Sequence, residues 1–167
     1  MNNKILLIGG IGAGKTTLKQ KLLNQTLVYL KTQAMDFSSF FIDCPGEYLE
    51  IPRHYHVLIN AAIKAAEVWA LHDATRRNCP YPPKFALALR KPVIGIITKI
   101  DHADACPAVA ESHLRKAGIT GTIYQVSAKE GLGIPELTRR LALVTGTVGL
   151  TAGKERPDRF RSGREYT

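Results

Sequence analysis

The chain has 167 residues, of which 45% are hydrophobic, and a formal net charge of +9. This length allows one well-buried domain rather than two, and no apolar run reaches the length of about 18 residues that a membrane span needs. No signal peptide precedes the first apolar run and the three cysteines form no C-x-x-C pair. We therefore expect a cytoplasmic protein with reduced thiols, without a disulfide framework or a zinc site.

The positive charge is scattered along the chain and is not interleaved with aromatic residues. This pattern makes nucleic acid an unlikely partner, since single-strand binders combine basic grooves with stacking aromatics. We interpret the charge as solvated surface together with a few lysines that bind a nucleotide.

Apolar runs alternate with helical patterns, which predicts βαβ units in an α/β three-layer fold with a mostly parallel central sheet flanked by helices. The expected strands are Lys4–Gly9, a weaker one at Ala34–Phe37, Ser39–Asp43, Val68–His72, Val93–Thr98 and Thr122–Val126. The expected helices are Lys15–Asn24, Arg53–Ala66, Lys84–Leu89, Pro107–Ala117 and Ile134–Thr145. Composition shifts to small and charged residues near the end, so we expect a domain over 1–146 and a flexible basic tail over 147–167.

The first expected strand runs directly into a glycine-rich segment that matches the phosphate-loop pattern G-x-x-x-x-G-K-[ST]. In such a loop, backbone N–H groups cradle phosphate oxygens and the following helix directs its positive end at the same anion. We expect Lys15 to contact the β- and γ-phosphates and Thr16 to ligate Mg²⁺. The expected phosphate-binding residues of this segment are Gly9, Gly10, Gly12, Ala13, Gly14, Lys15, Thr16 and Thr17.

A second motif, Asp43-Cys44-Pro45-Gly46, ends the strand expected at Ser39–Asp43. By itself it is an ordinary β-turn sequence. Because a phosphate loop precedes it, we expect Asp43 to hold Mg²⁺ through its water shell and the Gly46 amide to meet the γ-phosphate. Thr32, between the two motifs, is the expected threonine ligand of Mg²⁺ and the γ-phosphate, with Thr26 as the alternative.

Two further segments are predicted to bind the base of the nucleotide. Thr98-Lys99-Ile100-Asp101 and Ser127-Ala128-Lys129 follow the last two expected strands and resemble the [NT]-K-x-D and S-A-K guanine motifs of small GTPases. The Asp101 carboxylate can accept from both N–H groups on the edge of guanine, whereas adenine lacks both donors. We expect GTP or GDP as ligand, with ATP as the alternative, and guanine contacts from Thr98, Lys99, Asp101, Ser127, Ala128 and Lys129.

Together these motifs resemble a Ras-like P-loop GTPase. More narrowly, the chain resembles the EutP/PduV family of bacterial ethanolamine and propanediol utilisation, over about Lys4 to Thr145. The narrower resemblance is carried by Lys31–Ala34, Ile42–Glu50, Arg53–Leu58, Asp73–Thr75 and Lys91–Gly95. It implies association with bacterial microcompartments, whose shell or pathway proteins would be partners. It also implies a second activity, since the ethanolamine branch is described as an acetate kinase.

We expect slow GTP hydrolysis. Lys15 would neutralise charge on the transferred phosphoryl group. Glu47 stands where many GTPases carry a glutamine, and a carboxylate beside the γ-phosphate is electrostatically unfavourable, so a structural or regulatory role is favoured over that of a catalytic base. Ile11 occupies a loop position at which Ras keeps glycine and would hinder an arginine finger arriving from a partner.

Two alternatives stay open. An acetate kinase needs a cation for the acetate carboxylate, and Arg53 and His54 are the nearby candidates, unless both simply belong to a solvated helix start. A non-catalytic adaptor would bind nucleotide and dock through the tail or through Tyr48, Leu49, Ile51 and Tyr55.

Overall fold

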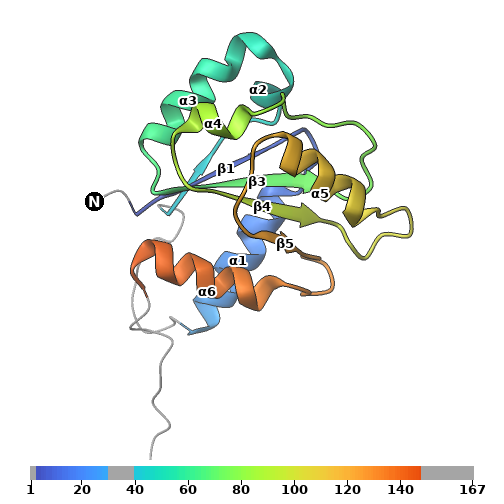
Figure 1. Ribbon diagram of the computed structural model, residues 1–167. Coiled ribbons are helices and arrows are strands. Elements are labelled where there is room, and N and C mark those ends of the chain that lie inside the picture. Colours follow the sequence, from blue (N-terminus) through green and yellow to red (C-terminus); the bar gives the residue numbers. More distant parts are fainter. Residues whose placement is uncertain (1–2, 30–39, 148–167) are drawn as a thin grey trace, which may run out of the picture.

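The computed structural model describes residues 3–29 and 40–147. Its five strands form one sheet in the order β2-β1-β3-β4-β5, and every neighbouring pair is parallel (Figure 1). The strands are β1 (Ile5–Gly9), β2 (Phe41–Asp43), β3 (Glu67–Asp73), β4 (Val93–Thr98) and β5 (Ile123–Gln125). The expected parallel α/β sheet is confirmed. Thr32, the weaker strand expected at Ala34–Phe37 and the tail beyond residue 147 lie outside the described residues, so the division into domain and tail stays a prediction.

The helices follow the expected positions with one exception. They are α1 (Lys15–Tyr29), α2 (Glu47–Glu50), the 3₁₀ helix η2 (Pro52–His54), α3 (Tyr55–Ile63), α4 (Phe85–Leu89), α5 (Pro107–Lys116) and α6 (Ile134–Thr145). The single helix expected at Arg53–Ala66 is divided, and an additional turn, α2, precedes it. Pro52 separates α2 from η2, because proline disfavours a helical conformation in the residue before it, and Ile51 is extended (φ −114°, ψ 108°).

Helices cover both faces of the sheet, with α1 and α6 on one side and α3, α4 and α5 on the other (Figure 1). Successive strand residues point to opposite faces. Along β1, Ile5 and Leu7 therefore pack with α1 and α6, while Leu6 and Ile8 pack into the opposite core. No helix within residues 3–29 and 40–147 is both long and apolar enough to cross a membrane. Because all the strands run in one direction, the loops at their carboxyl ends meet at a single edge, where α/β proteins bind ligands.

Candidate functional site

The phosphate loop follows β1 and holds its shape through its own backbone. The N–H of Ala13 donates to the carbonyl of Gly10 at 3.1 Å. Gly12 and Gly14 have φ angles of 74° and 89°, a conformation that a side chain would strain. Gly12 and Gly14 are thus required by the turn, and the loop ends at the start of α1, where helix N–H groups are unpaired and favour an anion.

Lys15 is the first residue of α1 and folds back over the loop. Its ammonium donates to the carbonyl oxygens of Gly9 at 2.8 Å and Gly10 at 3.2 Å, and the residue is only 9% exposed. Burial lowers the pKa of Lys15, and the nearby Asp43 carboxylate partly offsets this effect. The ammonium is therefore held at the phosphate loop before any ligand arrives, as its predicted role requires.

A cavity of about 450 Å³ separates the phosphate loop from the residues that follow β2. It is lined by Ile11, Gly12, Lys15, Thr16, Asp43, Cys44, Pro45, Gly46 and Glu47. The two motifs predicted to bind phosphate and metal are thus brought face to face across one space.

Thr16 and Asp43 would hold Mg²⁺ in this cavity. Their hydroxyl and carboxylate groups are hard oxygen donors, which Mg²⁺ prefers. Residues 3–29 and 40–147 contain no cluster of three or more His, Cys, Asp and Glu side chains suited to a metal. A pair of protein oxygens nevertheless fits Mg²⁺, because this ion keeps several waters and completes its shell with substrate phosphates.

Gly46 and Glu47 form the outer wall of the same cavity. Gly46 packs directly on the phosphate loop, since a methyl group at this position would lie 2.7 Å from the backbone nitrogen of Ile11. Glu47 begins α2 and is exposed. Arg53 and His54, the cations predicted for acetate, do not line the cavity. The His54 ring instead packs against Tyr48, with the centroids 5.1 Å apart and the planes tilted by 35°.

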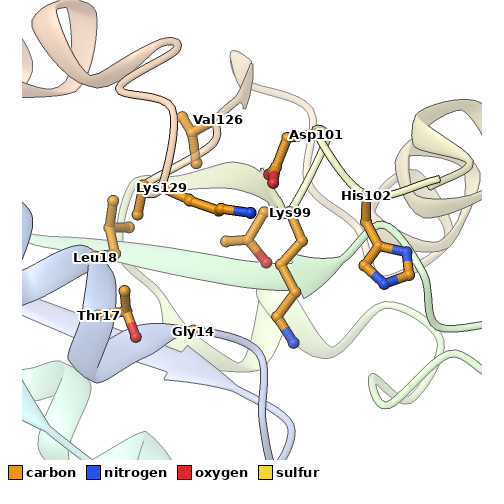
Figure 2. Close-up of a pocket in the computed structure, with 10 residues that line it drawn as sticks. Gly14, Thr17, Leu18, Lys99, Asp101, His102, Val126 and Lys129 are labelled. Atoms are coloured by element: carbon orange, nitrogen blue, oxygen red, sulfur yellow. The ribbon is translucent and has the colours of Figure 1, made fainter. Parts of the chain in front are cut away.

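A second cavity, of about 260 Å³, lies at the carboxyl ends of β4 and β5 (Figure 2). It is lined by Gly14, Thr17, Leu18, Thr98, Lys99, Asp101, His102, Val126, Ala128 and Lys129. Figure 2 shows Thr17 and Leu18 on α1 at one side and Asp101 on the loop after β4 at the other. Of the residues predicted to bind guanine, only Ser127 is absent from this lining.

Ser127 lies behind the cavity and supports Asp101. Its side chain is buried, and its hydroxyl oxygen accepts from the N–H of Glu130 at 3.0 Å. A hydrogen bond with Ser127 lowers the pKa of the Asp101 carboxyl, which is itself fully exposed. Asp101 is therefore ionised at neutral pH and open to an incoming base.

Thr98 joins the two motifs. Its buried hydroxyl donates to the carbonyl oxygen of Ala13 at 2.8 Å and approaches that of His72 at 3.4 Å. The sequence indicated only a weakened contact with the base, because threonine lacks the amide of the commoner asparagine. In the structure, Thr98 ties the end of β4 to the phosphate loop.

Lys99 has a partner that the sequence did not indicate. Its ammonium donates to Asp73 Oδ2 at 2.6 Å, and Asp73 Oδ1 accepts from the N–H and the hydroxyl of Thr75 at 2.8 and 2.7 Å. Burial would raise the pKa of Asp73, but the hydrogen bonds from Lys99 and Thr75 outweigh it and lower this pKa. The available signal was the Asp-x-Thr order after β3, which is typical of a side chain that bonds to the backbone two residues on.

The chain is similar to known proteins over most of its length. The family model described as ethanolamine utilisation and propanediol utilisation, PduV-EutP, matches residues 2–143. The propanediol utilization protein PduV of Citrobacter freundii is 37% identical over 135 residues, covering 80% of this chain and 89% of that protein. The probable acetate kinase EutP of Salmonella typhimurium is 31% identical over 144 residues, covering 85% and 91%.

Among solved structures, the FeoB G-domain from Methanococcus jannaschii superposes with a TM-score of 0.54 at 22% identity, covering 86% of this chain and 97% of that one. This similarity confirms a P-loop NTPase fold of the G-domain type. With the family match over residues 2–143, it follows that the chain is a GTPase-like P-loop protein and belongs to the PduV-EutP family of propanediol and ethanolamine utilisation.

Proposed function

We propose that this protein binds guanine nucleotides with Mg²⁺ and hydrolyses GTP slowly. The observation that carries the proposal is that the second cavity, the one lined by Asp101 and Lys129, adjoins the phosphate loop. We call it the base cavity. Gly14, Thr17 and Lys99 line the base cavity and also the hollow over residues 12–17 of the loop. One nucleotide can therefore place its base against Asp101 and its phosphates on the loop.

Asp101 supports guanine as the base. Its carboxylate is exposed at the cavity, and its lowered pKa keeps it ionised at neutral pH. An ionised carboxylate accepts hydrogen bonds and cannot donate them, which matches the two N–H donors of guanine. Adenine offers neither donor at this edge and would leave the charge without a partner.

Slow hydrolysis follows from the chemistry around the γ-phosphate. Lys15 would place positive charge on the phosphates, and Mg²⁺, when bound by Thr16 and Asp43, supplies the remaining neutralisation. The Gly46 amide would orient the terminal phosphate. Glu47 directly follows Gly46 and is the side chain there that could orient the attacking water. Its negative charge, however, opposes its approach to the phosphate oxygens.

Calorimetric titration with GDP and ADP, which differ only in the base, tests the proposal. The wild-type chain should prefer GDP by about a hundredfold or more. Asp101→Asn should remove most of that preference, whereas Glu111→Gln, an exposed carboxylate that pairs with Arg115 on α5 and lines neither cavity, should preserve it. Equal affinity of the wild-type chain for GDP and ADP would contradict guanine binding, and turnover of many GTP per second without a partner would contradict slow hydrolysis.

Phosphoryl transfer to acetate is the second candidate, because relatives from Salmonella typhimurium and Escherichia coli carry the name probable acetate kinase. In that reaction an acetate oxygen bonds to the γ-phosphorus and the bond from that phosphorus to the β–γ bridging oxygen breaks. Lys15 is the one cation among the described residues that line the cavity between the phosphate loop and Gly46, which we call the γ-phosphate cavity. Within residues 3–29 and 40–147, this lining therefore offers no second cation for the acetate carboxylate. Trapping acetyl phosphate made from acetate and GTP or ATP, beside measurement of free phosphate, separates the two reactions.

Family membership supports a further proposal, that the protein works in the cytoplasm beside a bacterial microcompartment. Co-sedimentation of a tagged chain with purified microcompartments tests it. Retention that persists in Lys15→Ala would favour the adaptor interpretation, because that variant lacks the phosphate-binding ammonium.

A further inference from the structure

Glu50 connects three segments that are distant in the sequence. It is the last residue of α2, and its Oε1 accepts from the backbone N–H of Ile11 at 3.0 Å and from Arg76 Nη1 at 2.8 Å. Ile11 belongs to the phosphate loop and Arg76 follows β3. We call Glu50, Arg76 and the Ile11 amide the Glu50 clasp. Through it, a side chain of α2 is bound to the backbone that surrounds the phosphates.

The clasp lies directly on the phosphate loop. A methyl group added to Gly10 would collide with the guanidinium of Arg76 and would lie 2.9 Å from Glu50 Oε1. Both atoms are the ends of flexible side chains, and Gly10 itself has no positive φ. Alanine at position 10 would therefore push the clasp away without straining the backbone of the loop.

The clasp holds the wall of the γ-phosphate cavity. Ile11, Gly46 and Glu47 all line that cavity, and the backbone of Gly46 packs against that of Ile11. The base cavity and the hollow over residues 12–17 contain no residue of α2. A diphosphate would therefore be bound without help from α2, whereas only a triphosphate reaches the wall that the clasp supports.

We propose that Glu50 and Arg76 are positioning residues that hold α2 against the phosphate loop and thereby favour the triphosphate over the diphosphate. This inference rests on the proposed binding of guanine nucleotides. The hydrogen bonds from Arg76 and Ile11 lower the pKa of the Glu50 carboxyl, so the clasp is intact at neutral pH. The side chains of Arg76 and Glu50 are 34% and 26% exposed, so the effect of losing the pair is expected to be moderate.

The first experiment measures the affinities of GDP and of a GTP analogue with an imido bridge by calorimetry. Glu50→Ala and Arg76→Ala should lower the affinity for the analogue by about three- to tenfold and change the affinity for GDP by less than about twofold. Glu50→Gln should fall between these variants and wild type, because an amide oxygen still accepts from Ile11. Glu111→Gln, which breaks an exposed ion pair with Arg115 on α5, is the matched control and should change neither affinity.

The second experiment is a double-mutant cycle on Gly10 and Arg76. Gly10→Ala should weaken the triphosphate analogue in the wild-type background, since its methyl group displaces the guanidinium. In the Arg76→Ala background, Gly10→Ala should lower this affinity by a smaller factor, because the guanidinium that the methyl group displaces is absent. Such coupling is not expected if Gly10 and Arg76 act on the nucleotide independently.

The outcomes separate the inference from the proposed function. If the wild-type chain binds guanine nucleotides but the variants keep its triphosphate-to-diphosphate ratio, or lose both affinities equally, the positioning role is wrong. If the wild-type chain binds no guanine nucleotide, the proposed function fails and the inference fails with it.

Discussion

The phosphate loop and the base cavity lie at the same edge of the sheet but are held together differently. In the loop, the Lys15 ammonium bonds to carbonyls five and six residues away. In the base cavity, Thr98 bonds to Ala13 across 85 residues and Lys99 to Asp73 across 26. The phosphate-binding lysine is thus held by its own segment, whereas the side chains of the base cavity are held by partners from distant segments. Changes in the loop should therefore weaken every nucleotide, and changes around the cavity should act on the base.

Lys15→Ala should have the largest effect. It removes a buried ammonium from the phosphates, so the affinities for GDP and ADP should both fall by about a hundredfold. Lys19→Ala, one turn further along α1 and 3.8 Å from Asp43, is the matched control and should retain most of the affinity. Calorimetry checks both variants. A loss of affinity for GDP alone or for ADP alone would contradict the proposal that the loop binds the phosphates independently of the base.

Thr98→Val should come next, because it cuts the tie between the two regions. The buried carbonyl of Ala13 would lose its donor, which should reduce the free energy of unfolding by about 1 to 2 kcal/mol. GDP affinity should fall as well, since the loop and the base cavity would no longer be fixed to one another. Thr98→Ser keeps the hydroxyl and should behave like wild type in urea denaturation, so an equal loss in both variants would assign the effect to packing instead.

The same contrast explains what could be predicted from the sequence. The phosphate loop, the parallel sheet and the placing of Asp43 and Asp101 after strands follow from local patterns of glycine and apolar residues. The partnerships Glu50–Arg76 and Asp73–Lys99 do not, because each is formed by tertiary packing between partly exposed polar residues that local periodicity leaves unassigned. The turn α2 and the 3₁₀ start of the helix expected at Arg53–Ala66 do not follow from the sequence either, because elements of three or four residues are too short to show a helical period.

Asp73→Asn should have a smaller and more selective effect. Lys99 would lose its ionic partner. Because Lys99 and Asp101 share one turn, Asp101 should then be held less firmly in position for the base. The pair is partly exposed, so GDP affinity should fall by about threefold, with a smaller change for ADP. Glu111→Gln on α5, which lines neither cavity, is the matched control. An equal loss of affinity for GDP and ADP would show that Asp73 does not act through the base.

His72 should affect nucleotide affinity least, yet it makes stability depend on pH. Its ring is fully buried at the end of β3, where Nδ1 donates to the carbonyl of Asp73 at 2.9 Å and Nε2 therefore accepts from His113 Nδ1 at 2.9 Å. Burial lowers the pKa of His72 below its ordinary 6.5, with His113 and Arg76 acting in the same direction.

The sign of this dependence follows from which state binds the proton. As the pH falls to 6.5 and below, the unfolded chain binds a proton at His72 before the folded chain does, so stability is lost as the pH falls through this range. The loss between pH 6.5 and 5.5 should not exceed about 1 kcal/mol, the limit for one histidine. Urea unfolding at pH 8.0, 6.5 and 5.5 should show a smaller slope for His72→Gln, and an unchanged one for the exposed control His56→Gln. Because the His72 carbonyl also supports Thr98, acid should loosen the base side of the site before the phosphate loop, and a phosphate loop that loses protection from amide hydrogen exchange first would contradict this order.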